Sequence, residues 1–386
     1  MTIGRSNSSA RRATRRRQRK IVLGMIEVSG YWSRMHAGLE LIGEDVTLLC
    51  IDEHPYAYSG QPRSLLMRLL RRARSGTRSN MNRIIEVVLR ALLLARYALT
   101  HDTFVFGYRT SFFNTRDLWL LKLLGKTVVM VFHGSDERPP YMDGYLGSVP
   151  DDELIARTRD QKKRVDRCHS YADIIVSNPS SGQFQSGRCL TYHVLGNPVS
   201  TTAKPTRARP GTAAQRTINI VHAPSSPDAK GSALIRRVCR ELKASGLDIE
   251  LQEVIDVSNA ELHRRILDAD FVIDQAYGDC PWAMLAAEAS LLGRPVVIGG
   301  YGYDANGLDR YLPEGLVPPA ARCEPDDLAG TIRWLAMDEQ ARLALGQQAQ
   351  DFASTRWSPV AVAQRLLMAI DGNAPDNWYF EAETVD

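Results

Sequence analysis

A repeated alternation of short apolar runs and amphipathic stretches constrains the fold of this 386-residue chain most strongly. The runs are rich in Val, Ile and Phe, and the stretches between them carry apolar residues at helical spacing. This alternation is typical of a parallel sheet, because two parallel strands need a crossover, usually a helix. Strands are expected at 21–25, 46–51, 103–106, 127–132 and 173–177, and again at 218–222, 249–255, 271–275 and 295–298.

The alternation is interrupted by residues 199–216, which contain Pro, Thr, Ala and Arg and almost no large apolar side chain. Such a composition is typical of a linker, and the chain is long enough for two domains. We therefore predict an α/β fold with two Rossmann-like domains and a ligand cleft between them. The predicted parts are a disordered basic tail (1–19), an N-terminal domain (20–198), the linker (199–216), a C-terminal domain (217–372) and a C-terminal tail (373–386).

Charge is distributed unevenly along the chain. Residues 1–100 carry 18 Lys and Arg against 7 Asp and Glu, although the whole chain has a net charge of only +4. A basic front half indicates an anionic partner, such as a membrane surface, a nucleic acid or an acidic substrate. The arginine-rich tail lacks interleaved aromatic residues, so we expect no specific binding to nucleic acid.

The cysteines point to the compartment. All six are scattered, and none forms a CxxC pair. This spacing argues against a disulfide framework or a zinc site and favours a reducing compartment. No apolar run reaches the ~18 residues that span a bilayer, and the first 20 residues lack the apolar core of a secretion signal. We therefore expect a cytoplasmic protein.

Residues 63–99 contain two basic stretches with helical periodicity. Four leucines between residues 65 and 70 form one stripe beside several arginines, and residues 81–99 continue the mixture. One interpretation is a solvated face over an ordinary core. The other is a pair of interfacial helices on an anionic leaflet, where each basic residue can add about 1 kcal/mol. The second interpretation predicts peripheral attachment to the inner face of a membrane.

A polar loop, HAPSSPDAKG at 222–231, separates an expected strand from an expected helix. Small and polar residues here let the backbone approach a phosphate, and a helix N-terminus carries partial positive charge. Lys230 is poorly placed for stability, because a cation at a helix N-terminus costs about 0.3–1 kcal/mol. A bound anion would remove this conflict. The alternative is a surface lysine in a turn.

An almost wholly apolar helix is expected at 283–292, and Glu288 is its only charged residue. A buried carboxylate without a partner is costly. Either a neighbouring arginine pairs with Glu288, or ligand hydroxyls do, as ribose hydroxyls do in nucleotide sites. The residues alone leave both alternatives open.

His133 lies in the segment HGSDER, directly after an apolar strand. A histidine in such a place can be a satisfied core residue, but its position at the carboxyl end of a strand favours the cleft. Asp136 and Arg138 follow it and either form a local ion pair or contact an acceptor. Asp268 and Asp270 form an Asp-x-Asp pair, a spacing that can hold a metal. They precede a strand, at the opposite edge of the sheet, so we predict a solvated turn and no metal.

Several of these segments resemble group 1 retaining glycosyltransferases, the family-4-like enzymes of the GT-B fold. HAPSS…KGS, ADFVIDQ and EASLLGRPVV are similar to the C-terminal half of that family, and LLKLLGKTVVMVFHGSDER to its N-terminal half. The resemblance covers about a third of the chain, in the same order and spacing. It implies transfer of a hexose-type sugar from a nucleoside diphosphate to a glycan or lipid-linked acceptor, in surface polysaccharide or glycolipid assembly, with no metal or other cofactor.

The resemblance also implies roles for individual positions. His133, Lys230 and Glu288 would be the catalytic residues, with His133 facing the donor sugar, Lys230 the diphosphate and Glu288 the ribose. The other donor-binding positions would be Ser225, Gly231, Asp274, Trp282, Ala283 and Met284, and the acceptor side of the cleft would hold Ser29, Gly30, Asp136 and Arg138.

Two positions depart from the family pattern. Relatives usually carry a Glu eight residues before Glu288, where this chain has Cys280, and some relatives without that Glu carry a pair like Asp274-Gln275. The Gly-Arg pair usual before the lysine is replaced by Ala223-Pro224. The alternative function is therefore a catalytically degenerate GT-B protein that acts as a binding partner or scaffold. A sugar-nucleotide epimerase would need further carboxylates, which the sequence does not offer in order.

Overall fold

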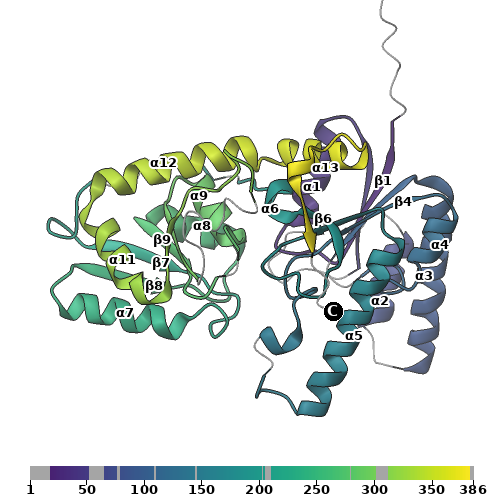
Figure 1. Cartoon of the computed structure of the whole chain (residues 1–386), viewed down its shortest axis with the longest axis horizontal. Coiled ribbons are helices and arrows are strands. Elements are labelled where there is room, and N and C mark those ends of the chain that lie inside the picture. Colours follow the sequence, from purple (N-terminus) through teal and green to yellow (C-terminus); the bar gives the residue numbers. More distant parts are fainter. Residues whose placement is uncertain are drawn as a thin grey trace, which may run out of the picture.

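The computed structural model describes residues 18–51, 65–75, 79–107, 110–143, 146–201, 203–204, 210–278, 280–300 and 312–382. Two α/β domains lie side by side along the long axis of the molecule (Figure 1). Most of the predicted basic tail (1–17), the beginning of the basic stretch (63–64), part of the linker (202 and 205–209) and the end of the C-terminal tail (383–386) lie outside the described residues.

The N-terminal sheet consists of β1 (Lys20–Met25), β2 (Asp45–Cys50), β3 (Thr103–Gly107), β4 (Thr127–Val131), β5 (Ile174–Ser177), β6 (Gly187–Thr191) and β12 (Tyr379–Ala382). The strand order is β12-β6-β5-β4-β3-β1-β2, and β12 alone runs antiparallel to its neighbour. Strands β1 to β5 are those expected from the sequence. β6 and β12 were not predicted.

Helices cover both faces of this sheet. One face packs against α2 (Leu65–Ser75), α3 (Asn80–Thr100), α4 (Leu118–Leu123) and α5 (Asp151–Tyr171), and a single-turn helix η1 (Pro140–Met142) precedes α5. The other face packs against α1 (Tyr31–Leu41), α6 (Tyr192–Leu195) and α13 (Pro359–Ile370). The strands are therefore buried on both sides, which explains their nearly continuous apolar composition.

The C-terminal sheet is entirely parallel and has the order β11-β10-β9-β7-β8. Its strands are β7 (Ile218–His222), β8 (Ile249–Glu253), β9 (Phe271–Gln275), β10 (Val296–Gly299) and β11 (Ala321–Cys323). One face packs against α7 (Ser232–Ala244) and α11 (Leu328–Met337), and the other against α8 (Asn259–Asp268), α9 (Met284–Leu291) and α12 (Glu339–Arg356). The short helix η2 (Pro325–Asp327) leads into α11, and η3 (Asp376–Trp378) leads into β12.

Both sheets reverse their winding direction at the same relative place. β1 lies between β2 and β3, and β7 lies between β8 and β9. In doubly wound sheets of this order, ligands bind outside the carboxyl ends of the strands at the reversal. The loop after β1 contains Ser29 and Gly30, and the loop after β7 is residues 223–231. Both predicted loops therefore lie at a switch point.

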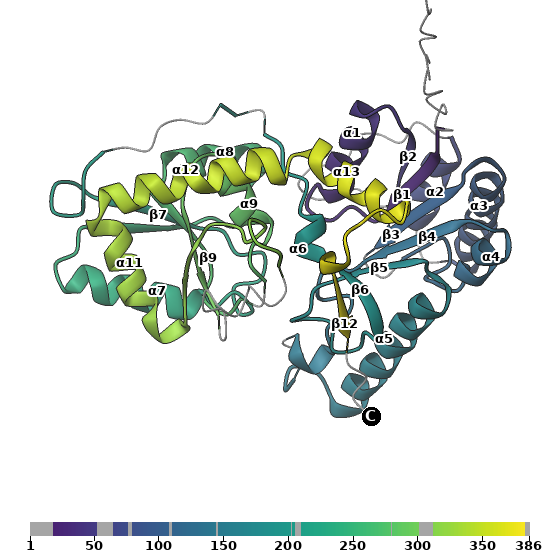
Figure 2. The same ribbon diagram turned by 45° about the horizontal axis from the view of Figure 1, so that its top comes forward.

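The predicted C-terminal boundary is wrong. Residues 359–370 form α13, whose apolar side chains pack with strands β1, β3, β4 and β5 of the N-terminal sheet, and residues 379–382 form β12 of that sheet. Figure 2 shows α12 over the C-terminal domain and α13 over the N-terminal one. An amphipathic pattern predicts that α13 is a helix, but it does not tell which of two apolar sheets the helix covers.

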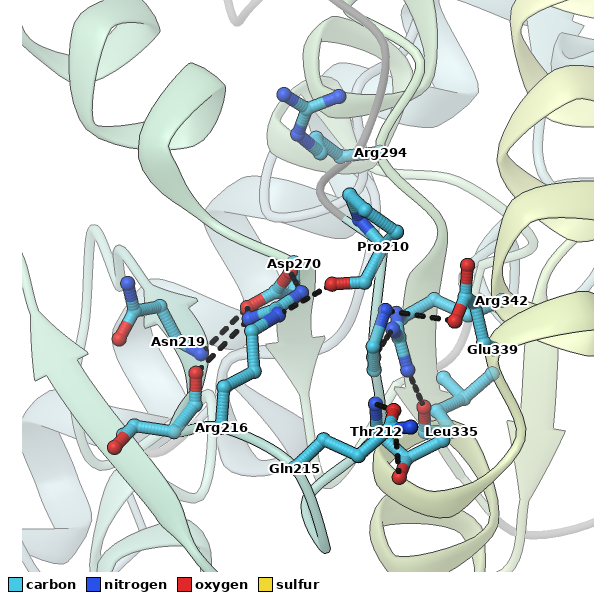
Figure 3. Close-up of polar contacts among 12 residues, drawn as sticks. Pro210, Thr212, Gln215, Arg216, Asn219, Asp270, Arg294, Leu335, Glu339 and Arg342 are labelled. Carbon is cyan, nitrogen blue, oxygen red and sulfur yellow. Dashed lines mark hydrogen bonds and ion pairs between the residues drawn. The ribbon is translucent and has the colours of Figure 1, made fainter.

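The second half of the predicted linker is anchored to the C-terminal domain. Arg216 forms an ion pair with Asp270 (2.5 Å), and Gly211 donates its backbone N–H to Glu339 (2.7 Å). Asp270 is completely buried and also accepts the backbone N–H of Asn219 (2.8 Å; Figure 3). The prediction of a solvated turn is therefore wrong for Asp270, whose buried carboxylate pairs with Arg216 and accepts a backbone N–H from strand β7.

Candidate functional site

A cavity of about 150 Å³ lies between the two domains. On the N-terminal side it is bounded by the loops that follow β1, β4 and β5 and by α6, and on the C-terminal side by the segment that follows β9. Six of the predicted site residues line it together: Ser29, His133 and Arg138 from one domain, and Trp282, Ala283 and Met284 from the other.

The loop at Ser29 and Gly30 is shaped by a buried carboxylate that the sequence analysis did not single out. Glu27 accepts the backbone N–H groups of Trp32 and Ser33, each at 3.0 Å, and so satisfies free amides in the first turn of α1. Ser29 and Gly30 both have positive φ, 47° and 80°. Gly30 tolerates this conformation without strain, whereas Ser29 is held in it by its surroundings.

His133 belongs to a chain of hydrogen bonds that reaches the other domain. The hydroxyl of Tyr192 donates to Asn197 Oδ1, and Asn197 Nδ2 donates to the carbonyl oxygen of Trp282 (3.4 Å). Because its proton is engaged, the Tyr192 oxygen accepts from His133 Nδ1 (3.2 Å). The imidazole therefore carries its proton on Nδ1 and leaves Nε2 as an acceptor.

The charge state of His133 follows from its burial. Desolvation lowers the pKa of His133 to about 3, so the ring is neutral near pH 7. Nε2 has no hydrogen-bond partner among the described residues. Rings of Tyr31, Trp32 and Tyr192 surround the imidazole at centroid distances of 4.8, 5.8 and 5.6 Å. The ring is thus a fixed, neutral hydrogen-bonding group.

The rest of the HGSDER segment holds the loop after β4 in place. Asp136 accepts the backbone N–H of His133 (2.7 Å), and Arg138 pairs with Asp143 (2.7 Å). Glu137 is fully buried and accepts from Ser177 (2.6 Å) and from Gln185 (2.6 Å). Burial, aided by the neighbouring charge of Asp136, raises the pKa of Glu137 to about 7.

Lys230 lies in the turn before α7, next to the segment after β9. Its Nζ donates to Gln275 Oε1 (2.5 Å), and its carbonyl accepts the N–H of Ala276 (2.9 Å). Gly231 has φ 71°, and a Cβ there would lie 2.8 Å from Ala276 and Tyr277. Only glycine therefore fits this close approach. Ser225 is exposed in the same loop, outside the residues that line the cavity.

Cys280, one of the two positions that depart from the resembled pattern, also lines the cavity. Burial raises the pKa of its thiol, while the positive charges of Lys230 and Arg138 act in the opposite direction and Asp274 reinforces the rise. Asp274 is itself buried, and its Oδ2 has no hydrogen-bond partner among the described residues. The thiol of Cys280 is therefore neutral and lies in the combined field of Lys230, Arg138 and Asp274.

Glu288 lies one turn after Met284 on α9 and points at the other domain. Its side chain is 3% exposed and forms an ion pair with Arg34 of α1 (2.5 Å). Asn259 donates to both carboxylate oxygens (3.1 and 3.3 Å), and His263 Nε2 lies 3.4 Å from Oε2. The arginine partner that the sequence analysis offered as one alternative is therefore Arg34.

Other lining residues were missed by sequence reasoning. Tyr192, His193 and Asn197 follow β6, a strand that the analysis did not predict, so nothing marked them as lying at a strand end. His193 is buried, and desolvation lowers its pKa to about 3. Asn178 and Ser181 follow the predicted strand β5, and this position after a strand could have identified them as cavity-lining residues.

Two further features of the described residues bear on the partners of the protein. No group of three or more His, Cys, Asp or Glu side chains in this part of the chain is arranged to hold a metal ion. Among the described helices, none combines the length and the apolar composition that a membrane crossing requires.

No protein-family model and no curated protein matches the sequence. Solved structures do match the fold. HepE from Anabaena, solved in complex with UDP-glucose, is 12% identical, with a TM-score of 0.54 over 92% of this chain and 100% of that one. Its complex with UDP and glucose gives 0.51 at 12% identity, again over 92% and 100%. This chain has the GT-B fold. GT-B folds have two Rossmann-like domains, as the sequence analysis expected.

Proposed function

We propose that this GT-B protein transfers a sugar from a nucleoside diphosphate to a glycan or lipid-linked acceptor, with a hexose as the sugar and retention at its anomeric carbon. The observation that carries the proposal is the interdomain cavity, in which predicted residues from both domains meet at the carboxyl ends of the strands. The UDP-glucose complex of HepE, which has the same fold, supports a nucleotide sugar as the donor. The proposed setting is surface polysaccharide or glycolipid assembly.

In this proposal the C-terminal domain holds the donor. Lys230 neutralises the diphosphate, and Ser225 and Gly231 belong to the same loop. Backbone N–H groups at Ala283 and Met284, where α9 begins, face the phosphates, because a helix N-terminus attracts anions. Glu288 accepts from the ribose hydroxyls.

The chemistry needs stabilisation of a leaving group more than a strong nucleophile. The bond between the anomeric carbon and the diphosphate oxygen breaks while the acceptor oxygen bonds to the same carbon, and the acceptor proton leaves with the phosphate. Preorganised positive charge is often the largest catalytic contribution to such a step. Lys230 and the α9 amides supply it without a metal. His133 offers a neutral acceptor to a sugar hydroxyl, since its pKa is lowered to about 3.

The acceptor would enter beside the N-terminal loops. Ser29 and Arg138 line the cavity, Gly30 directly precedes α1, and Asp136 holds the backbone of His133. We propose that these residues form the acceptor side. Arg138 is paired with Asp143, so it contributes a fixed rather than a mobile charge.

We further propose that the N-terminal domain docks on an anionic membrane through the basic stretch 63–99. Along α3, large apolar side chains are exposed at Met81, Ile84, Ile85, Val88 and Leu92, which recur at helical spacing and form one face. Side chains of 40–64% exposure on a single face exceed what a solvated helix needs. α3 lies at the end of the molecule remote from the C-terminal domain (Figure 1).

Charge on these helices favours a membrane over another protein surface. Arg68, Arg72, Arg83 and Arg96 are exposed on α2 and α3. Glu86 is the only acidic residue between positions 65 and 100, and it is paired with Arg90 (2.8 Å). An apolar face flanked by arginines matches an anionic leaflet, and attachment at the cytoplasmic face would bring a lipid-linked acceptor to the cleft.

The test is donor binding and turnover across UDP-, GDP- and TDP-sugars, with wild type, Lys230→Ala and Glu288→Ala compared by calorimetry. We expect one donor to bind and to be hydrolysed slowly, with at least tenfold weaker binding in each variant, because each removes a charged contact worth about 1.5–3 kcal/mol. Arg237→Ala, an exposed position on α7, serves as the control.

The second candidate is a degenerate GT-B protein that serves as a partner or scaffold. Cys280 in place of the family's Glu favours it. Folded protein that binds no donor from the panel would support this second candidate, as would a donor that binds but is neither transferred nor hydrolysed.

A further inference from the structure

The carboxylate assigned to the donor ribose is already engaged by protein side chains in this structure. Glu288 accepts from Arg34 on Oε1 and from Asn259 on both oxygens, while His263 lies 3.4 Å from Oε2. Burial opposes ionisation, but His263 and Arg34 hold the pKa of Glu288 below its usual value, so the group is charged. Two ribose hydroxyls can bind there only if some of these partners withdraw.

Arg34 is the partner that comes from the other domain. It lies on α1, which follows the Ser29-Gly30 loop, and its guanidinium crosses the interface to α9. Nη1 contacts Met284 Sδ (3.2 Å) and the carbonyl oxygen of Ser29 (3.5 Å), two residues that line the cavity. Arg34 is 8% exposed, so its charge lies in a desolvated place at the edge of the donor site.

Asn259 and His263 differ from Arg34 in origin. Both belong to α8, which packs in the same domain as α9, so they remain beside Glu288 however the domains move. The Arg34–Glu288 ion pair is instead made only while the two domains are in contact. Loss of one partner from a buried ion pair strongly destabilises the protein, because the other partner is left charged and unpaired.

We propose that Arg34 occupies the ribose carboxylate in the donor-free protein and that the donor must displace it, so that donor affinity is set by competition between Arg34 and ribose. The proposal rests on the proposed function, in which Glu288 binds ribose. Arg34 is then a positioning residue: it holds the domains together before the donor arrives, and it is released towards Ser29 and the diphosphate when the ribose takes over Glu288. Free and donor-bound proteins would differ at this interface.

The proposal is tested by whether donor affinity rises or falls when Arg34 is replaced. Wild type, Arg34→Ala, Arg34→Lys and the exposed control Arg237→Ala are titrated by calorimetry with the donor that binds wild type, starting with UDP-glucose. Arg34→Ala removes the competitor and leaves a buried carboxylate for the ribose hydroxyls to satisfy, so we expect binding on the order of tenfold tighter, a change of about 1.4 kcal/mol. The donor affinity of Arg34→Lys should lie between those of wild type and Arg34→Ala, and that of Arg237→Ala should match wild type.

A second readout is independent of affinity. The radius of gyration from small-angle scattering should increase in donor-free Arg34→Ala, because the interdomain ion pair is gone, and should stay unchanged in Arg237→Ala. Arg34→Lys keeps the charge and should restore the wild-type value. A circular dichroism spectrum like that of wild type shows that Arg34→Ala has folded, and if it has not, Arg34→Lys carries the titration.

The outcomes separate this proposal from the one on which it rests. Donor binding that is weaker in Arg34→Ala would show that Arg34 contacts the donor itself, and unchanged binding would show that no competition exists. Either result overturns the proposal while the proposed function stands. No binding by wild type or by Arg34→Ala across the donor panel would overturn both.

Discussion

The backbone N–H of Val199 donates to the carbonyl oxygen of Trp357 at 2.9 Å. These residues lie in the two segments where the chain passes between the domains, so the bond ties both crossings together. The Trp357 ring is buried, stacks on His193 at a centroid distance of 6.2 Å and meets Trp282 edge-on at 5.2 Å. The crossing therefore packs against His193 and Trp282, two of the residues that line the interdomain cavity.

Gly196 should be intolerant of substitution at this crossing. A Cβ there would lie 2.7 Å from the Trp357 ring, and φ is +90°. Gly43 has a similar φ of +87° but nothing within 4 Å of the added Cβ. We expect Gly196→Ala to lower the free energy of unfolding by about 2–4 kcal/mol, through backbone strain and overpacking together, and Gly43→Ala by about 1 kcal/mol. Chemical denaturation measures both. Equal losses of unfolding free energy in the two variants would show that the Trp357 ring moves away from the added Cβ without an energetic cost.

Acid should destabilise the fold through its buried histidines. Desolvation lowers the pKa of His133 and of His193 to about 3, whereas an unfolded histidine titrates near 6.5. A group with a lowered folded-state pKa contributes stability above pH 6.5 and loses it as the pH falls towards 3, by up to about 1.4 kcal/mol per pH unit. His193→Phe, which keeps the stacking on Trp357, should flatten the decline of unfolding free energy between pH 6.5 and 4. If the unfolding free energy of His193→Phe declined in parallel with that of wild type, the lowered pKa of His193 would be contradicted.

Glu137 should act with the opposite sign. Burial raises its pKa in the folded protein to about 7, from an ordinary value of 4.5. The stability it contributes is complete below pH 4.5 and is lost as the pH rises through 7. Glu137→Gln keeps the shape but does not ionise. Its free energy of unfolding relative to wild type should therefore rise steadily between pH 5 and 8, and a constant difference would show that Glu137 does not titrate in this range.

Cys280 provides a chemical report on the cavity. Burial raises the pKa of Cys280 and of Cys323, so both thiols should react slowly with a maleimide at pH 7. Cys280 lines the cavity and Cys323 does not. We expect a bound nucleotide sugar to slow modification of Cys280 at least fivefold and to leave Cys323 unchanged, as measured by peptide mass spectrometry. Equal effects on both thiols would place the ligand elsewhere.

The apolar face of α3 should decide membrane binding. Val88 on α3 and Ile155 on α5 are both 50% exposed, which makes them a matched pair. Val88→Glu should weaken sedimentation with phosphatidylcholine–phosphatidylglycerol vesicles by about tenfold, because it removes apolar area and adds repulsion worth about 1 kcal/mol. Ile155→Glu should have little effect. If both variants sediment like wild type, α3 is not the contact surface.

The sequence predicted the strands that carry the site because these strands are buried on both faces. Their nearly continuous apolar runs and the following Gly or polar residues remain visible in a single sequence, and this placed Ser29, His133 and Lys230 at strand ends. β6 was missed because its sequence, GRCLT, has only one large aliphatic residue and begins with glycine. The residues it positions, Tyr192 and His193, were missed with it.

The partner of Glu288 could not be predicted for a different reason. Arg34 is 254 residues away and belongs to the other domain, so no periodicity or spacing relates the two. The same holds for Glu137, whose hydrogen bonds depend on how loops from different strands meet. Local patterns predict elements and their order, whereas the pairing of buried charges depends on the three-dimensional packing.

The return of the last helix and strand to the first domain has a consequence for biosynthesis. Val362 and Leu366 of α13 share a core with Ile21 and Leu23 of β1, and β12 completes the edge of that sheet. The first domain emerges from the ribosome with α1 and α6 on this face but without α13, and it stays so until residues 359–370 are made. The second domain, whose strands are contiguous, can fold before the first is finished. The apolar surface that α13 covers in the folded protein is therefore exposed throughout the synthesis of the second domain, when the nascent chain is most open to aggregation.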